Sequence, residues 1–178
     1  MPPKIDYLAL ARATPREQFV VAHPFLFLFG QAAPLREAGQ EGGGDFDEAT
    51  SAGGPSAPPE EGTASILVLP ICKTVATFPS MISVGRTANN DLVIPDPHVS
   101  RMHAYFQQDG EHLVLIDAGS QHGTSVDGQR LGPNRPVRVG PDQLVRFAQR
   151  ELVVLNAHAL WERVRRVGTP APRGSAGG

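Results

Sequence analysis

Short apolar runs separated by turn residues fill the middle of the chain. They are rich in β-branched side chains and lie at 66–71, 81–84, 92–94, 103–107, 113–116, 124–126, 137–139, 144–147 and 152–155. Such close spacing is typical of an antiparallel β-sandwich or barrel. Asp109-Gly110 and Asp127-Gly128 lie between runs, where a tight hairpin requires positive φ angles. The pattern therefore predicts one all-β domain over residues 65–156.

Helical periodicity is confined to the two flanks of this domain. Thr14 and Pro15, followed by Glu17, form a typical helix start, so a short helix is predicted over residues 15–22. After residue 156, apolar side chains recur at helical spacing and alternate with arginines. An amphipathic C-terminal helix is therefore predicted at residues 157–168.

The remaining segments differ sharply in composition. Residues 25–29 read Phe-Leu-Phe-Leu-Phe, an apolar stretch of strand length that would promote aggregation if it were exposed. We expect it to pack on the main domain or on a partner, and together with the first helix it makes up residues 1–30. Residues 31–64 are acidic and rich in Gly and Pro, which predicts a flexible linker. Residues 169–178 are predicted to form a disordered tail.

Bulk properties narrow the class of protein. The chain has 178 residues and a formal net charge of −2, which suits one domain with appendages and gives no global basic field for nucleic acid. Cys72 is the only cysteine, so no intramolecular disulfide can form and a reducing compartment fits. The start of the chain lacks a signal-peptide core, and residues 25–29 are too few to span a bilayer. We expect a cytoplasmic protein with no nucleic-acid or membrane partner.

Polar residues gather in three segments between the predicted strands, at 85–91, 97–103 and 119–124. Gly85-Arg86, Ser100-Arg101-Met102-His103 and Gly123-Thr124 occur in an order and spacing that closely resemble the forkhead-associated (FHA) domain family. The resemblance implies an FHA/SMAD-like β-sandwich of about eleven strands over roughly half of the chain. It also implies that loops at one end bind phosphothreonine peptides in signalling, with a phosphothreonine-containing protein as partner, such as a Ser/Thr kinase or its substrate.

The resemblance assigns roles to the matching residues. A phosphothreonine carries about −1.5 to −2 charges and three acceptor oxygens, so its receptor needs cationic and hydroxyl donors. Arg86 and Ser100 are expected to hold the phosphate or the nearby peptide backbone, and Arg101 adds charge. Gly85 and His103 are expected to support the binding loops, as is Gly123.

Two positions depart from the family pattern. The family usually has Asn before the Gly-Thr pair, where its side chain holds the peptide backbone, and this chain has His122. Gln121 stands where Thr or Ser is common. Both side chains can still donate hydrogen bonds, so we keep them as expected phosphopeptide contacts with a shifted specificity. Asn89, Asn90 and Asp91 of the first polar segment are expected to be turn residues that make local backbone bonds and do not contact the ligand.

Two alternatives compete with phosphopeptide binding. Ser100, His103 and Asp117 could be a nucleophile, a base and an orienting acid, but the sequence has no nucleophile elbow, Walker loop or metal-binding helix motif. We therefore expect no enzyme activity, no cofactor and no metal. The second alternative is an FHA-like interaction or scaffold domain that binds a partner independently of phosphate. The oligomeric state is left open.

Overall fold

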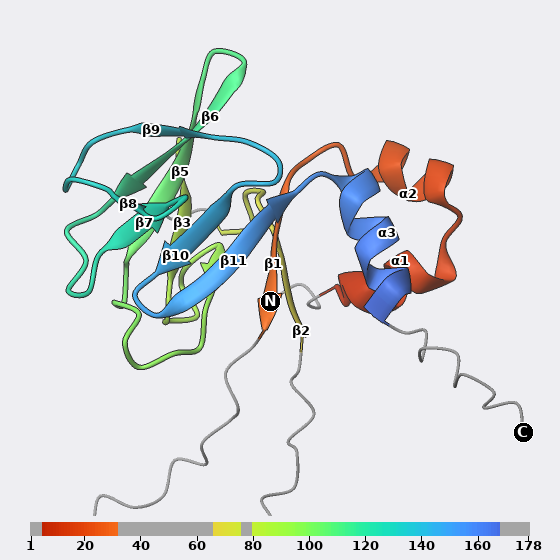
Figure 1. Cartoon of the computed structure of the whole chain (residues 1–178), viewed down its shortest axis with the longest axis horizontal. Helices are drawn as coiled ribbons and strands as arrows, with labels where there is room; N and C mark the ends of the chain where they lie inside the picture. The colour runs from red at the N-terminus through yellow and green to blue at the C-terminus, as the bar shows by residue number, and fades with distance from the viewer. Residues whose placement is uncertain (1–4, 32–65, 76–79, 168–178) are drawn as a thin grey trace, which may run out of the picture.

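A computed structural model describes residues 5–31, 66–75 and 80–167 of the chain (Figure 1). The predicted tail at 169–178 lies outside the described residues, as does the predicted linker except for its first residue, Gln31. The described part contains a β-sandwich and a small layer of helices beside it.

Eleven strands in the described residues form the two sheets of the sandwich, which confirms the predicted all-β fold. One sheet has the order β2-β1-β11-β10-β7-β8, and the other has the order β4-β3-β5-β6-β9. The strands are β1 (Phe27–Gln31), β2 (Ile66–Pro70), β3 (Ile82–Gly85), β4 (Leu92–Val93), β5 (Ala104–Asp109), β6 (His112–Asp117), β7 (Thr124–Val126), β8 (Gln129–Arg130), β9 (Val137–Val139), β10 (Leu144–Phe147) and β11 (Arg150–Leu155). Neighbouring strands are antiparallel, except that β3 and β4 pair in parallel.

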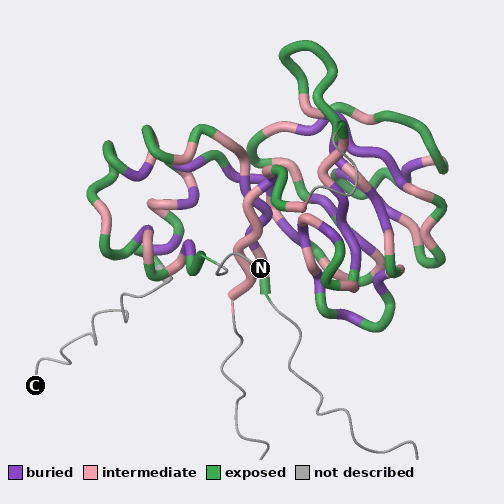
Figure 2. The backbone as a smooth tube through the Cα atoms, turned by 180° about the vertical axis from the view of Figure 1, so that it is seen from behind, coloured by how far each residue is buried: buried purple, intermediate pink, exposed green. Residues whose placement is uncertain are grey.

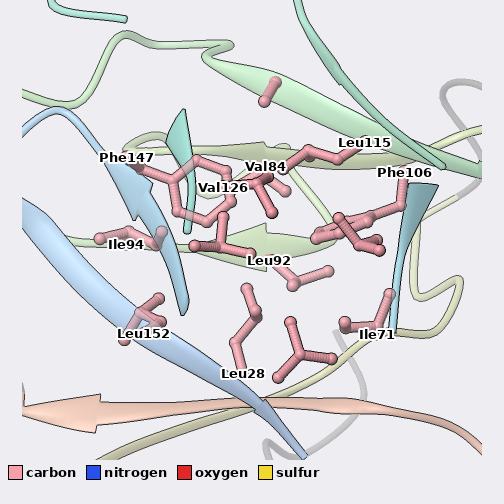
Figure 3. Packing of buried hydrophobic residues seen from close by; sticks show 14 of the residues in the cluster. Leu28, Ile71, Val84, Leu92, Ile94, Phe106, Leu115, Val126, Phe147 and Leu152 are labelled. Atoms are coloured by element: carbon pink, nitrogen blue, oxygen red, sulfur yellow. The ribbon is translucent and has the colours of Figure 1, made fainter. Parts of the chain in front are cut away.

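The apolar stretch near the N-terminus belongs to the sandwich. Its residues from Phe27 onward form β1, which pairs with β11 on one side and with β2 on the other. Leu28 faces the core between the sheets, whereas Phe27 and Phe29 join a second apolar cluster on the outer face. Figure 3 shows the core, in which Leu28 and Leu152 of the larger sheet face Val84 of the smaller sheet.

The two predicted hairpins both exist, but one differs in its turn. Asp127 and Gly128 have φ angles of 49° and 80° and form the two-residue connection between β7 and β8, as predicted. In the other hairpin Asp109 pairs with His112 in the ladder, so the connection is Gly110 with Glu111. Here Gly110 has the positive φ angle, at 60°.

Three helices cover the outer face of β1, β2 and β11 (Figure 1). They are α1 (Tyr7–Ala13), α2 (Arg16–Ala22) and α3 (Ala157–Val167). Their buried side chains form the second cluster with alternate residues of the strands: Tyr7, Ala11, Phe19, Phe27, Phe29, Leu155, Ala157, Leu160 and Val164. We call this region the helical layer. None of the helices in the described ranges is long and apolar enough to cross a membrane.

The N-terminal helices differ from the prediction in detail. The predicted helix at 15–22 is α2, but Pro15 is its N-cap and no side chain caps it. Thr14 instead ends α1, a helix that the pattern did not predict. Asp6 begins α1, because its Oδ1 accepts hydrogen bonds from the backbone N–H groups of Leu8 (3.0 Å) and Ala9 (3.1 Å).

Candidate functional site

Three loops meet at one end of the sandwich. The first loop (86–91) follows β3, the second loop (94–103) precedes β5, and the third loop (118–123) joins β6 to β7. Strand pairing places the end of β3, the start of β5 and the end of β6 together. Figure 2 shows the buried strands of the sandwich and the mostly exposed loops that join them. We call this region the loop end.

Ser100 joins the three loops. Its carbonyl oxygen accepts a hydrogen bond from the Arg86 backbone N–H at 3.1 Å. Its Oγ accepts from the Gln121 backbone N–H, also at 3.1 Å. Because Oγ acts as the acceptor in that bond, the hydrogen of the Ser100 hydroxyl remains available for a ligand.

The His103 side chain supports the point where the three loops meet. It is fully buried, and its Nδ1 accepts a hydrogen bond from the Ser100 backbone N–H at 3.1 Å. The hydrogen of a neutral ring is then on Nε2, which donates to the Gly123 carbonyl at 3.2 Å. Burial lowers the pKa of His103, which keeps the ring neutral. The ring thereby links the second and third loops.

The two supporting glycines are required for different reasons. A Cβ atom on Gly85 would collide with the backbone carbonyl of Arg101 and lie 2.8 Å from Nδ2 of Asn90. Gly85 therefore permits close approach of the first and second loops. Gly123 has a φ angle of 83°, and a Cβ there would lie 2.6 Å from the Arg130 guanidinium.

Four predicted contact residues, Arg86, Arg101, Gln121 and His122, are exposed at the loop end, and Ser100 is partly buried between them. Within the described ranges, Arg86 and Arg101 form no ion pair with a carboxylate. The structure thus gathers all the predicted site residues in one region, with two exposed guanidinium groups whose charge is not neutralised there.

The first loop is held by residues that were expected to make local turn bonds. Nδ2 of Asn90 donates to the Thr87 carbonyl at 2.9 Å, but also to the Arg101 carbonyl of the second loop at 2.7 Å. The Thr87 hydroxyl donates to the same Arg101 carbonyl at 2.9 Å. Asn90 therefore makes the expected local bond and, in addition, ties the first loop to the second.

Asp91 fixes the other end of the first loop through distant partners. Its fully buried carboxylate accepts hydrogen bonds from the Ser83 backbone and hydroxyl, from the backbone N–H groups of Thr74 and Val75, and from Nζ of Lys73. Burial alone would raise its pKa, but these donors lower the pKa of Asp91 to about 2. Sequence reasoning missed this role because the partners at 73–75 precede Asp91 by many residues.

Asp117 has a similar role beneath the third loop. Its Oδ2 accepts short hydrogen bonds of 2.6 Å from the hydroxyls of Ser120 and Thr124. Burial raises its pKa, but these hydroxyls and the loop N–H groups lower the pKa of Asp117 overall. Asp117 therefore orients the third loop. It does not complete a catalytic triad, because Nδ1 and Nε2 of His103 are both bonded to backbone groups.

Comparison with known proteins identifies the same segment. The FHA domain family matches residues 82–148, which include all three loops. An FHA domain-containing protein of Arabidopsis thaliana is 28% identical over 78 residues, covering 43% of this chain and 20% of that protein. The oxoglutarate dehydrogenase inhibitor of Corynebacterium jeikeium is 34% identical over 74 residues, covering 42% of this chain and 49% of the inhibitor. The chain thus spans half or less of the length of these relatives.

Among solved structures, the FHA domain of an Arabidopsis thaliana hypothetical protein is 26% identical, with a TM-score of 0.43, and the match covers 50% of this chain and 73% of that one. The segment that matches the family contains the motif residues from Gly85 to Thr124 and belongs to the β-sandwich. The segment at residues 82–148, which runs from β3 to β10, is therefore identified as an FHA domain.

Proposed function

We propose that the loop end binds a phosphothreonine peptide and that the chain is a phosphorylation-dependent interaction module in signalling. The observation that carries this proposal is the position of Ser100. Its carbonyl and hydroxyl oxygens accept hydrogen bonds from the backbone N–H groups of Arg86 and Gln121, so residues of all three loops meet at Ser100. A phosphate with three acceptor oxygens needs such convergence.

The chemistry of the exposed groups suits a dianionic ligand. Arg86 and Ser100 hold the phosphate, and Arg101 adds positive charge for the phosphate or for peptide residues beyond it. Each hydrogen bond to a charged group contributes roughly 1.5 to 3 kcal/mol, and ordering an extended peptide offsets part of this. The result is a reversible interaction that depends on phosphorylation.

The third loop completes the proposed site. Gln121 donates through its side-chain amide, and His122 donates through a ring nitrogen. Gly85, His103 and Gly123 act only as supports, because their bonds and packing connect the loops to one another.

The proposed partner is a phosphothreonine-containing protein, such as a Ser/Thr kinase or its substrate, in the cytoplasm. The similarity to a protein named as an inhibitor of oxoglutarate dehydrogenase supports a regulatory role over a catalytic one. In this proposal the chain acts by binding alone and carries out no reaction.

Calorimetry with matched phosphorylated and unphosphorylated threonine peptides tests the proposal. Wild-type protein should bind the phosphorylated form alone, and Arg86→Ala should abolish most of the affinity. Arg138→Ala is the matched control, because Arg138 is an exposed arginine on β9, outside the three loops. Equal affinity for both peptides would instead support the phosphate-independent interaction domain.

A further inference from the structure

A second histidine lies beside His122 at the loop end. The ring of His98, in the second loop, lies edge-on to the ring of His122, with 5.7 Å between centroids and 66° between planes. His122 directly follows Gln121, whose N–H is bonded to Ser100. The two imidazoles therefore lie next to the junction of the loops, and 48% of the His98 side chain is exposed.

Asp96 fixes the orientation of the His98 ring. Oδ1 of Asp96 accepts a hydrogen bond from the His98 backbone N–H at 2.8 Å and lies 3.1 Å from Nδ1 of the ring. Its other oxygen accepts from Nε of Arg150. Burial raises the pKa of Asp96, but the bonds from His98 and Arg150 outweigh burial and lower it. Asp96 is thus a carboxylate, so Nδ1 of His98 carries the hydrogen in this contact.

His98 therefore offers a hydrogen-bond acceptor at the edge of the proposed site, whose other groups are mostly donors. A neutral imidazole with its hydrogen on Nδ1 has a lone pair on Nε2. Arg86, Arg101 and the Ser100 hydroxyl offer donors, which suit phosphate oxygens. They cannot satisfy the backbone N–H groups of a bound peptide, and Nε2 of His98 can.

We propose that His98 is a further binding contact that sets the register of the phosphopeptide, an inference that rests on the proposed function. Nε2 of His98 accepts a hydrogen bond from a peptide backbone N–H within two residues of the phosphothreonine. Asp96 sets the tautomer, and the edge-on ring of His122 limits the rotation of His98. The contact fixes the register of the peptide without selecting a particular side chain.

Substitutions can separate hydrogen bonding from packing at this position. His98→Phe keeps an aromatic ring against His122 but removes the acceptor, whereas His98→Ala removes both. His112→Ala is the matched control, because His112 is an exposed histidine at the start of β6, at the opposite end of the sandwich. In thermal unfolding, His98→Phe and His98→Ala should show similar melting temperatures, since both lose the ring bond to Asp96, and His112→Ala should match wild type.

The ligand for this test is the phosphothreonine peptide that binds most tightly in a degenerate library. At about pH 8, where imidazoles are ordinarily neutral, His98→Phe and His98→Ala should each weaken binding by about two- to tenfold. His112→Ala should leave binding unchanged. Ester analogues of the peptide, each lacking one backbone N–H near the phosphothreonine, locate the partner. One ester should bind wild-type protein more weakly than the parent peptide does. The same ester and the parent peptide should bind His98→Phe with equal affinity.

The outcomes distinguish this inference from the proposed function. If His98→Phe binds the peptide as tightly as wild type, or if no ester shows this coupling, the His98 contact is wrong, even where Arg86→Ala abolishes binding. If wild-type protein does not distinguish phosphorylated from unphosphorylated peptide, the proposed function fails and this contact fails with it.

Discussion

The loop end and the helical layer stabilise the same sandwich by different physical means. The helical layer packs aromatic and aliphatic side chains on the outer face of β1, and Tyr7 and Phe19 are among its buried residues. At the loop end the buried side chains beneath the loops include His103, Asp91 and Asp117, and each is bonded to backbone groups or hydroxyls. Apolar burial has no preferred direction, whereas hydrogen bonds fix positions.

Because of this difference, the helical layer should contribute to stability and the loop end to ligand recognition. Buried polar side chains set the position of the exposed donors at the loop end. The helical layer contributes none of the proposed contact residues. Substitutions in the helical layer should therefore change stability alone, and substitutions of exposed loop residues should change binding alone. Substitutions of the buried polar residues should change both.

The largest effect is expected in the helical layer. Phe19 is fully buried and packs near Phe27, with 6.3 Å between ring centroids. Phe19→Ala should lower the free energy of unfolding by about 3 to 5 kcal/mol, because it leaves a cavity in an apolar cluster. Chemical denaturation measures the loss. Phosphopeptide affinity of the folded variant should match that of wild type, and a large loss of affinity would show that the two regions are coupled.

Substitution of Asp91 should lower the free energy of unfolding by an amount that depends on pH. Because the folded pKa of about 2 lies below the ordinary value of 3.8, the ionised carboxylate stabilises the folded state above that value. Asp91→Asn should cost about 2 to 4 kcal/mol near neutral pH, since it breaks a buried charged network. The difference in unfolding free energy between wild type and variant should be constant above about pH 5 and shrink from about pH 4 toward 2. A difference that does not change over this range would contradict the role of the charge.

Ser100→Ala should change binding more than stability. The variant loses a phosphate donor and the acceptor for the Gln121 N–H, so affinity should fall by roughly ten- to a hundredfold. The melting temperature should change little, because the Ser100 backbone bonds to Arg86 and His103 remain. Ser80→Ala, at an exposed serine outside the three loops, is the control and should bind like wild type.

The smallest predicted effect lies at the start of α1. Asp6→Ala removes the N-cap of this helix and should cost about 1 kcal/mol of stability. Asp6→Asn keeps an acceptor for the Leu8 N–H and should recover most of that loss. Thermal unfolding compares the three proteins, and equal melting temperatures would show that the cap does not contribute.

The sequence predicted those parts of the fold that depend on local patterns. Most strands appear as short apolar runs, and α3 appears as a periodic apolar face. Strand β8 has only two residues, Gln129 and Arg130, both exposed, so no apolar run marks it. Helix α1 was missed although Asp6 precedes it as a typical cap, because a helix of seven residues gives little periodic signal.

The sequence predicted the residues of the candidate site that belong to family motifs. It did not predict contacts between segments that are distant along the chain. Arg86, Ser100 and His103 were named from their order and spacing. The contacts of Asp91 with Lys73 and of His98 with His122 join residues far apart in sequence, and no local pattern encodes such pairs. Likewise, the requirement for glycine at position 85 comes from the approach of the Arg101 backbone, which only the folded structure reveals.

The most direct test of phosphopeptide binding at the loop end is a backbone amide NMR titration with a phosphothreonine peptide from the library. The N–H signals of Arg86, Ser100 and Gln121 should shift and saturate together, whereas those of α1, α2 and α3 should not move. The unphosphorylated peptide should cause no such shifts. Saturating shifts confined to the helical layer, or equal shifts with both peptides, would contradict phosphopeptide binding at the loop end.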